Sequence, residues 1–253
     1  MTIHTIRYSI LLAVLTWLPL GLSARTSADS LQLKARIGYS IGGTAPLGVP
    51  ATIRSIDAFR LTPSVMVGFD ATVPLGGTWG LLAGLRFENK GMNADVSTKA
   101  YFMEVSKGES TLDGLFTGRV SQKVSQWMLT VPVEATLRLG SHVQLKAGPY
   151  ISLLLSRNFS GVASDGYLRQ GDPRGAKVLM GDREGEWATY DFSSDMRRLQ
   201  FGVALGADFR IARHWGLSAD LNWGLTGIFP SSFKTVEQTL YPIYGTIGLF
   251  YRF

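Results

Sequence analysis

The chain has 253 residues, a formal net charge of +6 and no cysteine, so disulfides, a lipoprotein acylation site and thiolate metal sites are excluded. Its 29 glycines and 17% charged residues are typical of a glycine-rich β-protein rather than a helical one. The basic residues are dispersed among acidic ones and form no run with interleaved aromatics, so the charge does not predict a nucleic-acid partner.

The first residues resemble an export signal. Arg7 gives a short basic start, residues 9–22 are apolar, and small residues follow as far as Ala28. This order predicts a signal peptide over residues 1–24, cleaved somewhere in 24–28, and a mature domain over 29–253. A membrane anchor is the alternative, but the apolar run is shorter than the roughly 20 residues that a spanning helix needs.

Eight later segments alternate apolar and polar residues, the period of two that puts successive side chains of a strand on opposite faces. In the first, Leu33, Ala35 and Ile37 alternate with Lys34 and Arg36. In chain order the segments cover residues 31–41, 65–73, 80–88, 127–139, 143–155, 199–211, 217–225 and 243–253. The pattern predicts an all-β fold, although a soluble antiparallel sandwich alternates in the same way.

The connections between these segments alternate in length. Those over residues 74–78, 140–142 and 212–214 are short, whereas the connections after the first, third, fifth and seventh segments are long and polar. Short turns at one end and long loops at the other are typical of a transmembrane barrel with its short end in the periplasm. We therefore expect an antiparallel up-and-down barrel of about eight strands in the cell outer membrane, surrounded by outer-membrane lipid, with long extracellular loops.

The inward face of such a barrel carries charges of both signs. Eight strands leave an interior just wide enough for side chains, and buried charges persist only when they are paired. The sequence therefore predicts an interior ion network of Arg36, Asp70, Arg86, Glu88, Glu134, Arg138, Lys146, Asp208, Arg210, Asp220 and Arg252. Lys34 and Arg60 lie on the same predicted face. A selective channel lined by these charges is the alternative.

The last segment alternates to the final residue. A strand that ends on Tyr251 and Phe253 resembles the signal read by the barrel assembly machinery, which we expect as a partner. An ordinary last strand is the alternative.

Catalytic and metal-binding patterns are faint. His142 and His214 fall in predicted periplasmic turns, and no nucleophile stands at a recognisable spacing from a base, so we expect no enzyme and no catalytic residue. A lipid-modifying enzyme is the remaining catalytic alternative. The acidic GDREGE stretch, residues 181–186, has oxygen ligands that calcium favours but lacks the EF-hand spacing, so a solvated loop without metal or cofactor is expected.

Several strand phrases are distinctive. They are GLRFENKG (84–91), LTVPVEATLRL (129–139), VQLKAGPYISLLLS (143–156), FGVALGADFR (201–210), GLSADLNWGL (216–225) and residues 245–253. Together they resemble the PorT-type outer-membrane β-barrel proteins of Bacteroidota. The resemblance implies a barrel of about eight strands and brings no catalytic residues with it. The secretion role of the family's namesake does not follow from it.

These patterns together predict a non-enzymatic barrel with a structural or surface-interaction role. The extracellular loops over residues 157–195, and secondarily 89–121, are the expected contacts for an outer-membrane protein partner in a complex, because loops beyond about 15 residues are usually functional or disordered. A small solute channel is the alternative function.

Overall fold

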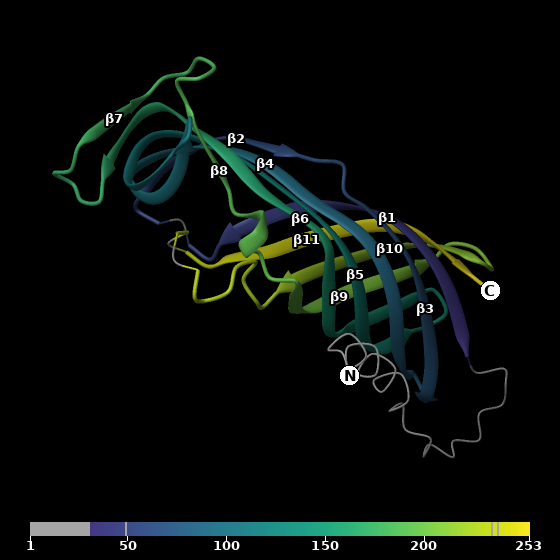
Figure 1. Cartoon of the computed structure of the whole chain (residues 1–253). Coiled ribbons are helices and arrows are strands. Elements are labelled where there is room, and N and C mark those ends of the chain that lie inside the picture. Colours follow the sequence, from purple (N-terminus) through teal and green to yellow (C-terminus); the bar gives the residue numbers. More distant parts are fainter. Residues whose placement is uncertain (1–30, 49, 234, 237) are drawn as a thin grey trace, which may run out of the picture. The chain divides into compact units, whose positions relative to one another are not determined.

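The computed structural model describes residues 31–48, 50–233, 235–236 and 238–253 (Figure 1). The predicted signal peptide and its cleavage region lie outside the described residues. No helix in the described part of the chain is long and apolar enough to cross a membrane.

Eight antiparallel strands close into a ring. They are β1 (Gln32–Pro46), β3 (Val65–Gly76), β4 (Trp79–Lys107), β5 (Ser110–Leu139), β6 (Val143–Gln170), β9 (Leu199–Arg210), β10 (Trp215–Gly224) and β11 (Leu240–Arg252). Neighbours in this order pair with one another, and β1 pairs with β11 from Lys34↔Arg252 to Pro46↔Leu240, which closes the ring. The predicted all-β, eight-stranded up-and-down barrel is confirmed.

The part of the ring next to the short turns, called its lower part, has the polarity of a transmembrane barrel. Its outward side chains are apolar and exposed, among them Ile37, Phe69, Leu85, Val133 and Leu205. Exposed aromatic residues border this belt near the short turns and again at the opposite end, as in interfacial girdles. They are Trp79, Trp215 and Phe253 at the first level and Phe87, Trp127 and Trp223 at the second.

Two of the expected extracellular loops are largely strand. The segment 89–121 forms no loop: β4 continues to Lys107, β5 begins at Ser110, and a two-residue turn at Gly108 and Glu109 joins them. Gly108 has a φ of +61°, a conformation that glycine adopts without steric cost and that this tight turn requires. The prediction of a long loop here was wrong because the alternation continues but changes sign: the polar residues now face outward and the apolar residues inward.

That change of sign is visible on both faces of β4. The outward series runs from Leu85 and Phe87 to Asn93 and Asp95. The inward residues change in the opposite sense, from charged Arg86, Glu88 and Lys90 to apolar Met92, Ala94 and Val96. On β5 the same transition falls beside Trp127, which pairs with Asn89. Above this level the sheet has an apolar inside and a polar outside, as a water-exposed sheet does.

Shorter strands complete the extracellular part. In the segment 157–195, β6 extends to Gln170 and is followed by β7 (Lys177–Met180), β8 (Ala188–Asp191) and the 3-10 helix η2 (Ser193–Asp195). Because β8 pairs with β6 and also with β4, through Ser106↔Thr189, strands β4, β5, β6 and β8 form a second, smaller ring (Figure 1). In the connection between β1 and β3, β2 (Ile53–Leu61) pairs with β4.

An apolar core fills this extracellular part. It joins residues of the second ring to residues near the barrel mouth, and it includes Met92, Met103, Val105, Phe116, Val120, Phe159, Leu168, Met180, Tyr190, Phe192, Ile228 and Phe229. The aromatic members are in contact: the Phe159 ring meets Phe229 at 4.9 Å between centroids, and Tyr190 stacks on Phe192 at 5.4 Å. The chain therefore has a polar interior within the apolar belt and an apolar interior above it.

Candidate functional site

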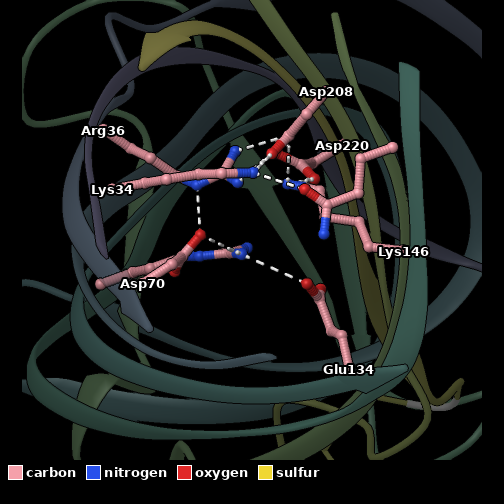
Figure 2. Close-up of polar contacts among 9 residues, drawn as sticks. Lys34, Arg36, Asp70, Glu134, Lys146, Asp208 and Asp220 are labelled. Carbon is pink, nitrogen blue, oxygen red and sulfur yellow. Dashed lines mark hydrogen bonds and ion pairs between the residues drawn. The ribbon is translucent and has the colours of Figure 1, made fainter. Parts of the chain in front are cut away.

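The barrel interior holds eight buried charged side chains that ion pairs connect (Figure 2). We call this cluster the interior ion network. Its basic members are Lys34, Arg36, Arg86 and Lys146, and its acidic members are Asp70, Glu134, Asp208 and Asp220. Each is at most 5% exposed. The four positive and four negative charges cancel formally, which is the condition for burying so many of them in one place.

Asp208 of β9 is the centre of the network because three cations meet its carboxylate. Lys34 Nζ lies 2.7 Å and Arg36 Nη2 2.6 Å from Asp208 Oδ2, and Lys146 Nζ lies 3.0 Å from Asp208 Oδ1. Lys146 also lies 2.7 Å from Asp220 Oδ1, in a close contact that is not aligned as a hydrogen bond. Asp208 thus ties β1, β6 and β9 together.

A second branch of the network is looser. Arg36 donates a hydrogen bond through Nε to Asp70, and Arg86 Nη2 lies 3.6 Å from Asp70 Oδ2 and 3.5 Å from Glu134 Oε2. The two Arg86 contacts exceed ordinary charge-assisted hydrogen-bond lengths. Within the part of the chain that the structure describes, neither Glu134 oxygen has a hydrogen-bond partner. Glu134 is therefore held mainly by charge.

The network crosses the full width of the barrel. Lys34 Nζ on β1 donates to Gln144 Oε1 on β6 at 2.6 Å, and β1 and β6 stand opposite each other in the ring. Closer to the extracellular end, Gln200 Nε2 on β9 donates to Gln126 Oε1 on β5 at 2.9 Å. Direct side-chain hydrogen bonds between strands that are not neighbours leave little room for a continuous water-filled path.

Two kinds of residue surround these charged side chains: glycines, which leave space for them, and an aromatic residue, which packs against them. A Cβ at Gly84 would lie 2.2 Å from Asp70 Oδ1, and one at Gly206 would lie 2.1 Å from Asp220 Oδ1, so glycine leaves the volume that the carboxylates occupy. The eighth strand, β11, contributes an aromatic face instead of a charge: the centroid of the Phe250 ring is 4.9 Å from Lys34 Nζ.

Glu88 lies in a separate pair above the network. Its Oε1 is 3.1 Å from Lys90 Nζ and also accepts a hydrogen bond from Thr130. Lys90 lies over the rings of Tyr150 and Tyr244, at 5.8 and 5.5 Å from their centroids. Sequence reasoning missed Lys90 because it assigned residue 90 to a loop, whereas its alternation with Glu88 carried the signal.

Besides Glu88, three predicted members lie outside the network. Arg138, Arg210 and Arg252 line the barrel mouth at the short-turn end. Each stands at or next to the last residue of its strand, so the side chain reaches the turns: Arg138 donates to the Gly77 carbonyl at 2.9 Å and Arg252 to that of Arg213 at 3.0 Å. Arg60 is 63% exposed on β2 and pairs with Asp95 at 2.8 Å.

Tyr251 and Phe253 lie among the aromatic residues at the short-turn end. The Tyr251 ring packs edge-on against Trp215 and Phe253, at 5.1 Å between centroids in both cases, and Phe253 stacks on Phe69 at 5.6 Å. The Phe253 amide donates to the Leu33 carbonyl across the β1–β11 closure. The final residue is thus built into the seam that closes the ring.

The two described histidines lie at the short-turn end of the barrel, where His142 Nδ1 lies 2.7 Å from Oγ of its chain neighbour Ser141 and both residues are exposed. His142 is exposed in the turn between β5 and β6, and His214 precedes β10, where its Nδ1 lies 2.8 Å from the Arg252 carbonyl oxygen. Among the described residues, no group of three or more His, Cys, Asp or Glu side chains is arranged to hold a metal ion.

A closed antiparallel ring with an apolar belt, aromatic borders and a paired polar interior defines a transmembrane β-barrel. The chain belongs to the outer membrane protein beta-barrel domain family, whose model matches residues 23–230. It is an outer-membrane protein, and its apolar belt faces lipid. The family match does not distinguish the PorT type.

Several solved bacterial surface and outer-membrane proteins match the chain in structure. They include Ail of Yersinia pestis (12% identity, 88% of this chain and 99% of that chain, TM-score 0.40) and Neisserial surface protein A (10% identity, 88% and 97%, TM-score 0.36). OprG from Pseudomonas aeruginosa is a third (12% identity, 88% and 96%, TM-score 0.39). No curated protein matches the chain in sequence.

Proposed function

We propose that the protein is a non-conducting, non-enzymatic outer-membrane barrel that uses its extracellular sheet to contact another outer-membrane protein. The observation that carries the first part is the hydrogen bond from Lys34 to Gln144 across the barrel, within a network of balanced charge. A channel would need a continuous polar path where these side chains meet. We also propose, from the strand phrases alone, that the chain is of the PorT type.

The extracellular part supports the interaction role. Strands β4, β5 and β6 have 29, 30 and 28 residues, whereas a membrane crossing takes about 9–11. The additional length is folded around its own apolar core, which a barrel that only spans the membrane does not need. Edge strand β7 pairs only with β6 among the described residues and carries Leu179, which is 66% exposed. An open edge with an apolar side chain is suited to pairing with another protein.

The experiment is co-purification from native outer membrane with residues 166–186, which include β7, replaced by a short Gly-Ser linker. The altered barrel should still shift its gel mobility on heating, because the membrane strands are intact, while the yield of any partner falls. A matched control, Leu179→Ser, changes only the exposed apolar side chain and should weaken the partner less. Undiminished partner yield from the linker variant would contradict the proposed role of this segment.

A further inference from the structure

The extracellular core contains a cavity of about 200 Å³. It lies above the interior ion network, between the ends of β1 and β2 on one side and β4, β5 and β8 on the other. Its lining includes the buried side chains of Met92, Met103, Val120, Phe159, Tyr190 and Phe192. These are members of the extracellular apolar core, so the cavity is a gap within that core.

The described part of the cavity wall carries no charged side chain. None of its described lining residues is Asp, Glu, Lys, Arg or His, and the polar ones are threonine, glutamine and tyrosine. Burial raises the pKa of the Tyr190 phenol, so this ring is neutral at physiological pH. A wall of this kind favours a neutral, apolar occupant over an ion or a sugar.

The barrel wall beside the cavity lacks backbone hydrogen bonds between two strands. β1 pairs with β3 only as far as Tyr39↔Val65, and the last backbone bond on that side runs from Ser40 N to Ser64 O. Above this level, among the described residues, β1 pairs only with β11 and β2 pairs only with β4. We call this interruption between β1 and β2 the β1–β2 seam.

Side chains alone cover the β1–β2 seam. Phe59 of β2 reaches over Gly43 of β1, where an added Cβ would lie 3.0 Å from Phe59 Cζ and 2.9 Å from Met92 Sδ. Phe59 is 49% exposed and Ile56 59% exposed, and both also line the cavity. Rotamer changes of exposed side chains occur in picoseconds to nanoseconds, so the seam can open without breaking a strand pair.

We propose that this cavity binds a small neutral apolar molecule, the size of a benzene derivative or the end of an alkyl chain, which enters through the β1–β2 seam. A 150 Å³ cavity lined by apolar side chains stays dry and takes benzene, so a cavity of about 200 Å³ has room for such a guest. Methionines adapt their shape to irregular guests. Binding in this cavity does not depend on the proposed contact between β7 and another protein.

The apolar occupant of the cavity has two possible sources, membrane lipid and dissolved molecules. The β1–β2 seam begins close to the aromatic border that contains Trp127. Trp127 pairs with Asn89 of β4, and Met92, three residues further along β4, pairs with Leu61 of β2. Alkyl chain ends of lipid and dissolved apolar molecules can both reach this level.

The absence of cysteine from the chain allows a direct test. Val120→Cys places one thiol in the cavity, and Ser121→Cys, the next residue of β5, places one in the polar outer groove as a matched control. Each variant is treated with neutral N-phenylmaleimide and with a negatively charged methanethiosulfonate, both in lipid nanodiscs and in lipid-free amphipol. Heat-modifiable gel mobility verifies the fold in every sample.

The proposal predicts that the Val120→Cys thiol prefers the neutral reagent over the charged one at least tenfold more strongly than the Ser121→Cys thiol does. Added toluene should slow the Val120→Cys reaction and leave that of Ser121→Cys unchanged. Protection in nanodiscs that disappears in amphipol would identify a lipid chain end as the occupant, and equal reactivity in both would identify a dissolved molecule. A Val120→Cys thiol that is inert in both media, insensitive to toluene, or equally open to the charged reagent would overturn the proposal.

Discussion

At the scale of residues, the energetics of the barrel interior depend on how many partners each buried charge has. Among the described residues, Asp208 forms ion pairs with three cations, whereas Glu134 forms one only with Arg86, at 3.5 Å. Sequence alternation was sufficient to identify Arg36, Asp70, Arg86, Glu134, Lys146, Asp208 and Asp220 as inward-facing. It could not show that Arg138, Arg210 and Arg252 reach the turns, because that depends on how far each stands from the end of its strand.

The unequal partner numbers predict unequal losses of stability. Asp208→Asn leaves Lys34, Arg36 and Lys146 without their shared anion, and breaking a buried pair costs on the order of 3–5 kcal/mol. Glu134→Gln, which deprives only Arg86, should lower the free energy of unfolding by clearly less. Urea unfolding in lipid vesicles, followed by gel mobility, measures both. Equal losses, or a larger loss for Glu134→Gln, would show that the network is not centred on Asp208.

Phe253 gives a second prediction at this scale. Its deletion removes the ring stack on Phe69 and the hydrogen bond from the Phe253 amide to the Leu33 carbonyl, where β1 and β11 close the ring. The barrel should therefore assemble more slowly with the assembly machinery in reconstituted membranes. Phe69→Leu removes the same stack but keeps Phe253. Comparing the two variants separates the effect of the lost stack from that of the lost terminal residue. If both variants assembled at the unaltered rate, Phe253 would have no part in an assembly signal.

At the scale of elements, the sign of the alternation marks where each strand leaves the membrane. The eight membrane strands were predictable because apolar-out alternation is their signature, and the short turns gave their pairing order. The extensions of β4, β5 and β6 were not recognised because the same period continues with polar residues outside. The cavity had no signal in the sequence, since its wall combines segments from β1 near the start of the described chain to β11 near its end.

Substitutions along β5 test where the membrane ends. Val133 faces outward within the apolar belt, and Ser125 faces outward two residues beyond Trp127. Arginine on the lipid face costs about 2–4 kcal/mol at the midplane and about 0–1 kcal/mol near the interface. We therefore expect Val133→Arg to lower the free energy of unfolding in vesicles by several times more than Ser125→Arg. Comparable losses at the two positions would place both in the same environment and contradict the boundary beside Trp127.

At the scale of the whole molecule, two interiors of opposite polarity are stacked in one barrel. The ion network lies inside the apolar belt, where lipid covers the outside, and the apolar core lies above it, where water covers the outside. This division explains how a single continuous sheet can be surrounded by lipid in one part and by water in the other. It also separates the proposed roles, because closure of the lumen belongs to the network whereas contacts with molecules belong to the extracellular part.

Conductance across a planar lipid bilayer tests closure of the lumen most directly. The unaltered protein, inserted and heat-modifiable, should give no stable single-channel steps, because Lys34–Gln144 and the Asp208 contacts join opposite walls. A variant that removes the bridging side chains, Lys34→Ala with Gln144→Ala, should show small openings if it still inserts. Reproducible, ion-selective steps from the unaltered protein would contradict the account and favour a solute channel.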